Sequence, residues 1–259
     1  LATQYGVAVY MHRPIGLLME RKPLIVDYNT PLEQVSKSAL ARTDESIYDY
    51  IIVVRDGEYC GTTTVKHLLE KTSQLELNRA KHSNPLTGLP GNVLIEEKLK
   101  QVIADDSFYA VLYFDLDNFK AYNDVYGFEN GDKVICATAQ LIQEHLEVLA
   151  APGAFLGHVG GDDFVAVIRS ADVAGFCEEV INAFDERVKD FYSEEDKERG
   201  HLVTHNRHGV IEKYPLSTLS IAVVTNRECS YRTPAEIGEA AGQVKKRCKM
   251  IWKSCYQIA

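Results

Sequence analysis

Two pairs of acidic residues stand at the ends of apolar runs in this sequence. Asp115 and Asp117 end the run YAVLYFDLD, and Asp162 and Asp163 follow two glycines in GHVGGDDF. Residues two apart in a strand point to the same side, and Mg2+ prefers oxygen ligands together with substrate phosphates. We therefore predict a metal and phosphate site with Asp115 as a ligand, whereas Asp117 is expected to cap or shape the start of the next helix.

The run GHVGGDDF also fits an ordinary hairpin. Two glycines followed by Asp between apolar runs are a common turn signal, because glycine adopts positive φ freely and Asp tolerates exposure. These eight residues alone leave both interpretations open, a catalytic turn and a structural hairpin.

The stretch after the first acidic pair offers groups for an anion and for a purine. A helix is predicted to begin near Asn118, and its free N–H groups around Phe119 and Lys120 can receive phosphate oxygens. Asn123 lies one turn further, and we place Asp132 in a loop. Both side chains suit the edge of guanine, whose N–H donors a carboxylate accepts, although either residue could also be a simple helix or turn cap.

The elements that position these residues predict an α/β protein in two parts. Residues 23–71 follow the pattern β-α-β-β-α, with Thr30 as a helix N-cap. A helix over residues 65–83 then leads into the second part, where the strand at residues 109–117 carries the first acidic pair. We set the domains at 1–80 and 81–259.

Composition limits the function further. The chain has 259 residues, a formal charge of −9 and no apolar run of about 18 residues, which argues against nucleic-acid binding and against a membrane segment. The six cysteines lack C-x-x-C spacing, which argues against a zinc site. Because the sequence begins at Leu1 rather than Met, we expect a piece of a longer protein. The lack of a signal-peptide pattern and of a membrane segment predicts a cytoplasmic location.

The motifs NPLTGLPGN, FDLDNFKAYNDVYGFENGD and GGDDF occur in the order and spacing of the GGDEF family, which residues 83–259 resemble. That family consists of diguanylate cyclases, which condense two GTP into cyclic di-GMP. The resemblance implies a nucleotidyl-cyclase-like domain, a mixed central sheet flanked by helices, with Mg2+ or Mn2+ as cofactor. Since one domain binds one GTP, it also implies a homodimer.

The resemblance assigns roles to individual residues. It implies that Asp163 and Asp162 are catalytic, and that Asp163 replaces the usual Glu, is one methylene shorter and so lowers activity. His158 stands where the family commonly has Arg. The implied ligands are Asp115, Asp162, Asp163 and the Leu116 carbonyl for metal; Asn123 and Asp132 for guanine; and Phe119, Lys120, Lys249 and Lys253 for phosphates, with the last two on one helical face.

The first part resembles a CBS repeat, a regulatory unit, preceded by the tail of another repeat. Thr64 matches the residue that contacts a nucleotide phosphate, but His67 replaces the ribose-binding Asp. The combination is similar to proteins in which these parts follow an EAL domain, so an upstream EAL domain and GTP or cyclic di-GMP are the expected partners. The alternative is a catalytically inactive GGDEF-like sensor or dimerisation module that regulates an upstream domain.

Overall fold

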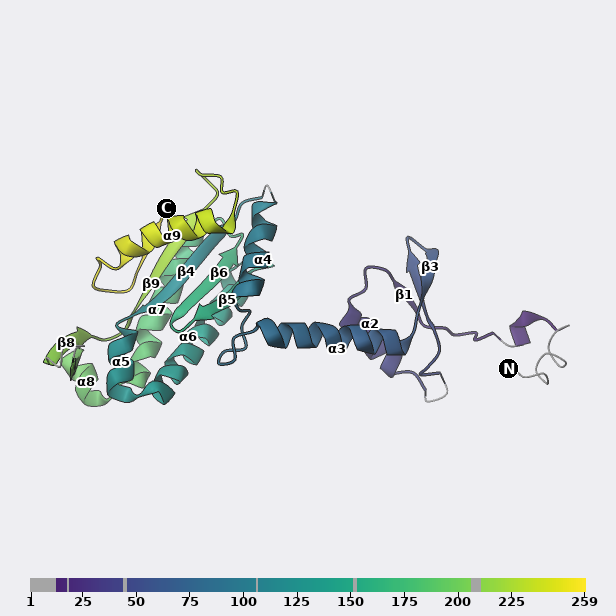
Figure 1. Cartoon of the computed structure of the whole chain (residues 1–259), viewed down its shortest axis with the longest axis horizontal. Coiled ribbons are helices and arrows are strands. Elements are labelled where there is room, and N and C mark those ends of the chain that lie inside the picture. Colours follow the sequence, from purple (N-terminus) through teal and green to yellow (C-terminus); the bar gives the residue numbers. More distant parts are fainter. Residues whose placement is uncertain (1–12, 18, 44–45, 106, 151–152, 206–210) are drawn as a thin grey trace. The chain divides into compact units, whose positions relative to one another are not determined.

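The protein divides into two units, Leu1–Asn78 and Arg79–Ala259, which are described separately. The first residues, which the sequence suggested are the tail of another repeat, lie mostly outside the described part. The computed structural model describes residues 13–17, 19–43, 46–105, 107–150, 153–205 and 211–259 (Figure 1).

The first unit contains a small three-stranded sheet. Strand β1 (Ile25–Asp27) pairs in parallel with β2 (Ile51–Arg55), which pairs antiparallel with β3 (Glu58–Thr63). A short 3-10 helix, η1 (Ile15–Leu17), precedes the sheet. The unit therefore has the β-α-β-β-α order that the sequence predicts, once its two helices are included.

Helix α2 (Leu32–Leu40) covers this sheet, and helix α3 (Val65–His82) follows it. Val35 of α2 packs with Ile51 of β2 in a small buried cluster. The N-cap of α2 is Pro31 without a side-chain hydrogen bond, so the prediction of a Thr30 cap was wrong. Proline has no N–H to be satisfied at a helix start, which makes this position suitable for it.

The second unit is built on a five-stranded sheet in the order β10-β9-β4-β6-β5. The pair β10–β9 is parallel and the other three pairs are antiparallel, so the sheet is mixed. The predicted acidic strand is central. The strands are β4 (Ala110–Asp117), β5 (Phe155–Gly160), β6 (Asp163–Ile168), β9 (Thr218–Thr225) and β10 (Cys255–Ile258).

Helices cover both faces of this sheet (Figure 1). Successive residues of β4 point to opposite faces, so Val111 joins the core beneath α4 and α9, whereas Leu112 joins the larger core beneath α5, α6 and α7. The predicted α/β fold with a mixed sheet flanked by helices is confirmed. These helices are α4 (Asn92–Ile103), α5 (Phe119–Tyr126), α6 (Phe128–Leu149), α7 (Val173–Arg187) and α9 (Pro234–Cys248).

A small subassembly lies between α7 and β9. Tyr122 of α5 stacks on Tyr126 with ring centroids 4.8 Å apart, and Tyr192 meets Tyr122 edge-on at 5.1 Å. Burial raises the pKa of Tyr122 to about 12, and its hydroxyl donates to the Phe191 carbonyl at 2.9 Å. These contacts pack the segment around Phe191 and Tyr192 against α5. The small subassembly is made of this segment and the short elements that follow it. It comprises η2 (Val188–Phe191), α8 (Glu194–Arg199), β7 (His201–His205) and β8 (Ile211–Pro215).

None of the helices in the described ranges combines the length and the apolar composition that crossing a bilayer would require.

Candidate functional site

The hairpin of GHVGGDDF joins β5 to β6 through a two-residue turn. β5 ends at Gly160, Gly161 and Asp162 form the turn, and β6 begins at Asp163. Gly160 and Gly161 have φ values of 144° and 58°, which L side chains rarely adopt, so the glycines serve the turn itself. The structural interpretation of the hairpin therefore holds, and it places Asp162 at the tip.

The two acidic pairs meet where the interior strand β4 ends and the interior strand β6 begins. Asp163 pairs in register with Asp115 across the β4–β6 ladder. Lys245 of α9 joins them, with its Nζ 2.5 Å from Asp115 Oδ2 and 2.6 Å from Asp163 Oδ1. Lys249 forms ion pairs with both Asp115 and Asp117. We call Asp115, Asp117, Asp162 and Asp163 the carboxylate cluster.

Asp115 is the most enclosed member of this cluster. It is only 8% exposed at the centre of the sheet, where an unpaired carboxylate would be costly. Its partners are the two ammonium groups, so the charge is compensated by residues that come from the far end of the chain. The neighbouring Leu116, the predicted carbonyl ligand, is buried in β4.

Asp117 does not cap the following helix. No side chain caps α5, whose N-cap is Asn118 in the left-handed region at φ 60°. Asp117 Oδ2 instead accepts hydrogen bonds from Thr218 Oγ1 at 3.1 Å and Ser220 Oγ at 2.6 Å on β9. The capping prediction was wrong because these cross-strand hydroxyls lie on the same face as the carboxylate. Burial raises the pKa of Asp117 above its usual range.

Asp162 differs from the rest of the cluster. No ion pair within 4 Å reaches it from the described residues, and it is half-buried at the turn. Burial raises the pKa of its carboxyl, and the negative charge of Asp163 adds to this rise.

The donor set of the cluster suits a hard divalent cation. All the donor atoms are carboxylate oxygens, the ligands that Mg2+ prefers. The Lys245 ammonium group already occupies a point that Asp115 and Asp163 both reach, and so acts as a stand-in cation. Within the described ranges, no three His, Cys, Asp or Glu side chains are yet grouped closely enough to hold a metal ion.

The two predicted guanine ligands lie on adjacent helices. Asn123 is on α5, and Asp132 is exposed on the second turn of α6, so placing Asp132 in a loop was wrong. The neighbouring Gly131 suggested a loop, but it lies within α6. A glycine is needed there because the helix backbone passes too close to the Asn123 side chain to leave room for a Cβ. The buried Asn123 Oδ1 has no hydrogen-bond partner among the described residues.

Gly131→Ala is expected to disturb this contact. A Cβ at Gly131 would lie 1.9 Å from Asn123 Oδ1 and 3.2 Å from the Phe119 ring. Overpacking of this kind lowers the free energy of unfolding by about 1–3 kcal/mol, which urea denaturation measures. Gly238→Ala on α9 is the matched control: nothing lies within 4 Å, so it should be neutral or stabilising. Equal effects of the two substitutions would contradict the prediction.

The predicted phosphate ligands divide into two groups. Phe119 and Lys120 open α5, whose first N–H groups receive no side-chain cap. Lys249 is the C-cap of α9 and reaches the carboxylate cluster. Lys253 lies four residues beyond, in an exposed bend, because α9 ends at Cys248. The two lysines therefore do not share a helical face, and that prediction was wrong.

A pocket of about 280 Å3 opens beside Lys249. Asp117 and Asn118 form its wall on the side of β4, and Trp252, 86% exposed, stands at its rim. The pocket thus adjoins both the carboxylate cluster and the start of α5, where a phosphate chain would meet ammonium and backbone N–H groups.

Sequence reasoning gave no role in this site to two of its residues, Lys245 and His158. Lys245 carries the central ammonium group, and its spacing of four from Lys249 was the available signal. His158 is buried to 2% exposure, and its ring nitrogens lie 3.0 Å from Thr87 Oγ1 and 2.9 Å from the Gly161 carbonyl. His158 therefore joins the NPLTG loop to the acidic turn.

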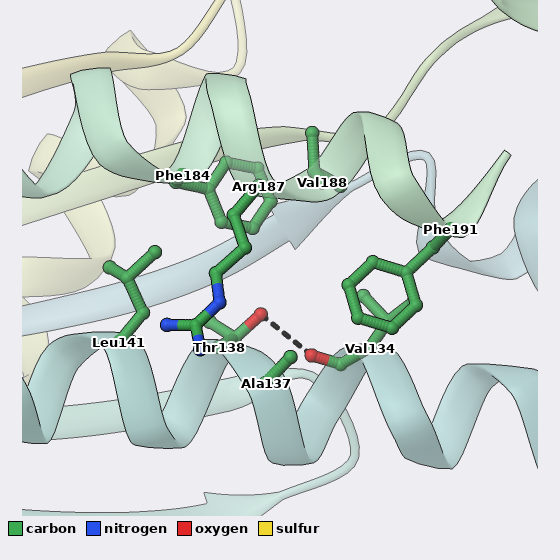
Figure 2. A pocket seen from close by; sticks show the side chains of 8 residues that line it. All are labelled: Val134, Ala137, Thr138, Leu141, Phe184, Arg187, Val188 and Phe191. Atoms are coloured by element: carbon green, nitrogen blue, oxygen red, sulfur yellow. Dashed lines mark hydrogen bonds between the residues drawn. The ribbon is translucent and has the colours of Figure 1, made fainter.

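Other hollows lie away from this site. A void of about 10 Å3 between α6 and α7 is lined by side chains such as Phe184 and Arg187, and it has room for at most about one water molecule (Figure 2). The first unit has a pocket of about 440 Å3 that includes Arg42 and Thr62. Thr64, the predicted nucleotide contact, accepts a hydrogen bond from the His67 N–H at 3.1 Å and so caps α3.

Comparisons of the sequence with a family model and with curated proteins point to the same family. Residues 81–210, half of the chain, match the model described as "Diguanylate cyclase, GGDEF domain". The bifunctional diguanylate cyclase/cyclic di-GMP phosphodiesterase MucR of Pseudomonas aeruginosa is 33% identical over 46% of this chain and 18% of its own length. The cyclic di-GMP phosphodiesterase PdeB of Shewanella oneidensis is 25% identical over 82% of this chain and 21% of its own.

Solved structures share the fold. The coiled coil and GGDEF domain of DgcB from Caulobacter crescentus, in complex with c-di-GMP, aligns with a TM-score of 0.55 at 22% identity, covering 75% of this chain and 93% of that one. The chain spans only about a fifth of the length of the curated relatives named above.

Proposed function

Because the chain belongs to the GGDEF family of diguanylate cyclases, we propose that its second unit binds GTP and joins two GTP molecules into cyclic di-GMP. The observation that carries this proposal is that Asp115 and Asp163 both contact one positive group, the Lys245 ammonium. A pocket lined by Lys249 lies beside them. A site of this kind is suited to a nucleotide whose phosphates bring a divalent cation with them.

The proposed roles follow the positions of the side chains. Asn123 and Asp132 would hold the guanine edge, where the Asp132 carboxylate would accept from guanine N–H groups and the Asn123 amide can both donate and accept. The N–H groups of Phe119 and Lys120 would receive the β and γ phosphate oxygens, and Lys249 would neutralise their charge.

The proposed metal ligands are Asp115, Asp162 and Asp163, with the Leu116 carbonyl. Mg2+ or Mn2+ bound there would assist the attack of a 3′-hydroxyl on an α-phosphorus and would neutralise the leaving pyrophosphate. Asp162 lies in the hairpin turn and can shift to reach the metal, whereas Asp115 is buried in the sheet and would hold its position. Asp163 would complete the set from the start of β6.

The reaction needs two nucleotides, and each domain would hold one. We therefore propose that two copies of the chain face each other through their acidic hairpins, as a homodimer. The first unit is proposed to be a regulatory CBS-type segment, with residues 1–80 as its extent, in a longer protein that includes an EAL domain. The similarity of the chain to MucR and PdeB, both much longer than this chain, supports a multidomain context.

The test is a direct assay for product. Purified chain with GTP and Mg2+ is expected to form cyclic di-GMP, detected by chromatography and mass spectrometry. Asp132→Ala is expected to weaken GTP binding about five- to 150-fold, because losing a hydrogen-bond partner of a bound base costs about 1–3 kcal/mol. GTP binding without product would favour the inactive sensor, whereas no GTP binding would sink both interpretations.

A further inference from the structure

Lys245 occupies the centre of the carboxylate cluster. Its Nζ lies 2.5 Å from Asp115 and 2.6 Å from Asp163, the two residues that face each other across the β4–β6 ladder. The side chain is 33% exposed, whereas that of Asp115 is 12% exposed. The lysine thus reaches from the rim of the site to its most enclosed carboxylate.

Two lysines offset part of the negative charge of the carboxylate cluster without any metal, at every member except Asp162. Lys245 and Lys249 bring two positive charges to the three carboxylates of Asp115, Asp117 and Asp163. A divalent cation added at the point where Asp115 and Asp163 converge would meet the Lys245 ammonium group at the same oxygens. Two cations cannot share those oxygens at contact distance without strong repulsion.

We propose that Lys245 competes with the divalent cation for Asp115 and Asp163, so that metal binds only when this side chain swings away. The inference rests on the proposed function for the identity of the metal ligands. Lysine suits such a role because its ammonium group sits on a flexible four-carbon stem and can return to water. The partial exposure of Lys245 gives it an open path toward solvent.

Competition of this kind lowers the apparent metal affinity by the fraction of molecules whose site is open. Removing the competing ammonium group is therefore expected to tighten metal binding. If the open form is about a tenth of the population, the gain is about tenfold. Lys249 stays in place in such a variant and continues to balance Asp115 and Asp117.

The experiment titrates the complete chain with Mn2+ in the absence of nucleotide and follows free Mn2+ by electron paramagnetic resonance. Lys245→Met removes the charge, and Lys245→Gln does so while keeping a hydrogen-bond donor, in case the first variant unfolds. Lys246→Met is the matched control, since it removes the same charge from an exposed position one residue further along α9. Thermal unfolding shows that each variant is folded.

We expect both Lys245 variants to bind Mn2+ about tenfold more tightly than the unchanged chain, and Lys246→Met to differ little. Equal tightening by all the variants would reduce the effect to net charge and overturn the proposal. Unchanged or weaker binding in the Lys245 variants, or no Mn2+ binding in any of the proteins, would overturn it as well. The proposed function fails separately, when the unchanged chain binds Mn2+ but forms no cyclic di-GMP from GTP.

Discussion

Asp115→Asn is expected to lower the rate of cyclic di-GMP formation by about 100-fold or more. Asp115 is the buried member of the carboxylate cluster and the one that both lysines reach. Removing its charge takes away a proposed metal ligand and leaves Lys245 and Lys249 with fewer anionic partners. Losing one preorganised electrostatic group in an active site typically costs 100- to 1000-fold in rate.

The measurement is the initial rate of product formation at saturating GTP and Mg2+, together with the melting temperature. Asp105→Asn is the matched control, because Asp105 makes the same type of ion pair with Arg169, at 2.5 Å, on the surface. An exposed pair contributes little to stability, so this control should keep its rate. A normal rate for Asp115→Asn would remove Asp115 from the proposed mechanism.

Much of the fold was readable from the sequence. The apolar run YAVLYFDLD predicted a strand, and eight of its residues form β4. Their side chains alternate between the two cores of the unit. The two glycines of GHVGGDDF predicted a hairpin turn, and in the structure both adopt positive φ at that turn. Local patterns of this kind report local geometry, and both acidic pairs were therefore placed on the right elements.

The errors arose where a distant contact overrides a local signal. Gly131 looked like a loop residue, but a helix turn there needs a residue without a Cβ to pass Asn123. Asp117 was expected to cap a helix, yet the hydroxyls that it binds come from β9, about a hundred residues further along the chain.

The end of α9 shows the same limit. Its helical spacing was extended to Lys253, but the chain leaves the helix after Cys248 to form β10 beside β9. Because the helix ends there, the two lysines that contact the carboxylates are Lys249 and, one turn before it, Lys245. The shared helical face that was expected for Lys249 and Lys253 is therefore absent, while their role toward phosphates stays a prediction.

Asp163→Glu is expected to raise the rate of cyclic di-GMP formation by up to about 100-fold. The fourth position of the GGDEF signature carries Glu by name, and Asp163 is one methylene shorter. A carboxylate held about 1 Å from its working position can cost about 100-fold in rate. Asp163 is at the first residue of β6, and its side chain is 40% exposed, so there is room for a longer one.

The comparison is made with Asp162→Glu, which adds the same methylene at the tip of the turn. Asp162 already matches the signature, so lengthening it should lower the rate or leave it unchanged. Both variants are assayed for product alongside the unchanged chain. Product from Asp163→Glu alone would identify the unchanged chain as an enzyme disabled by that one shortened side chain. An unchanged rate would mean that the Asp163 carboxylate already reaches its partner, and the shortened signature would then carry no loss of activity.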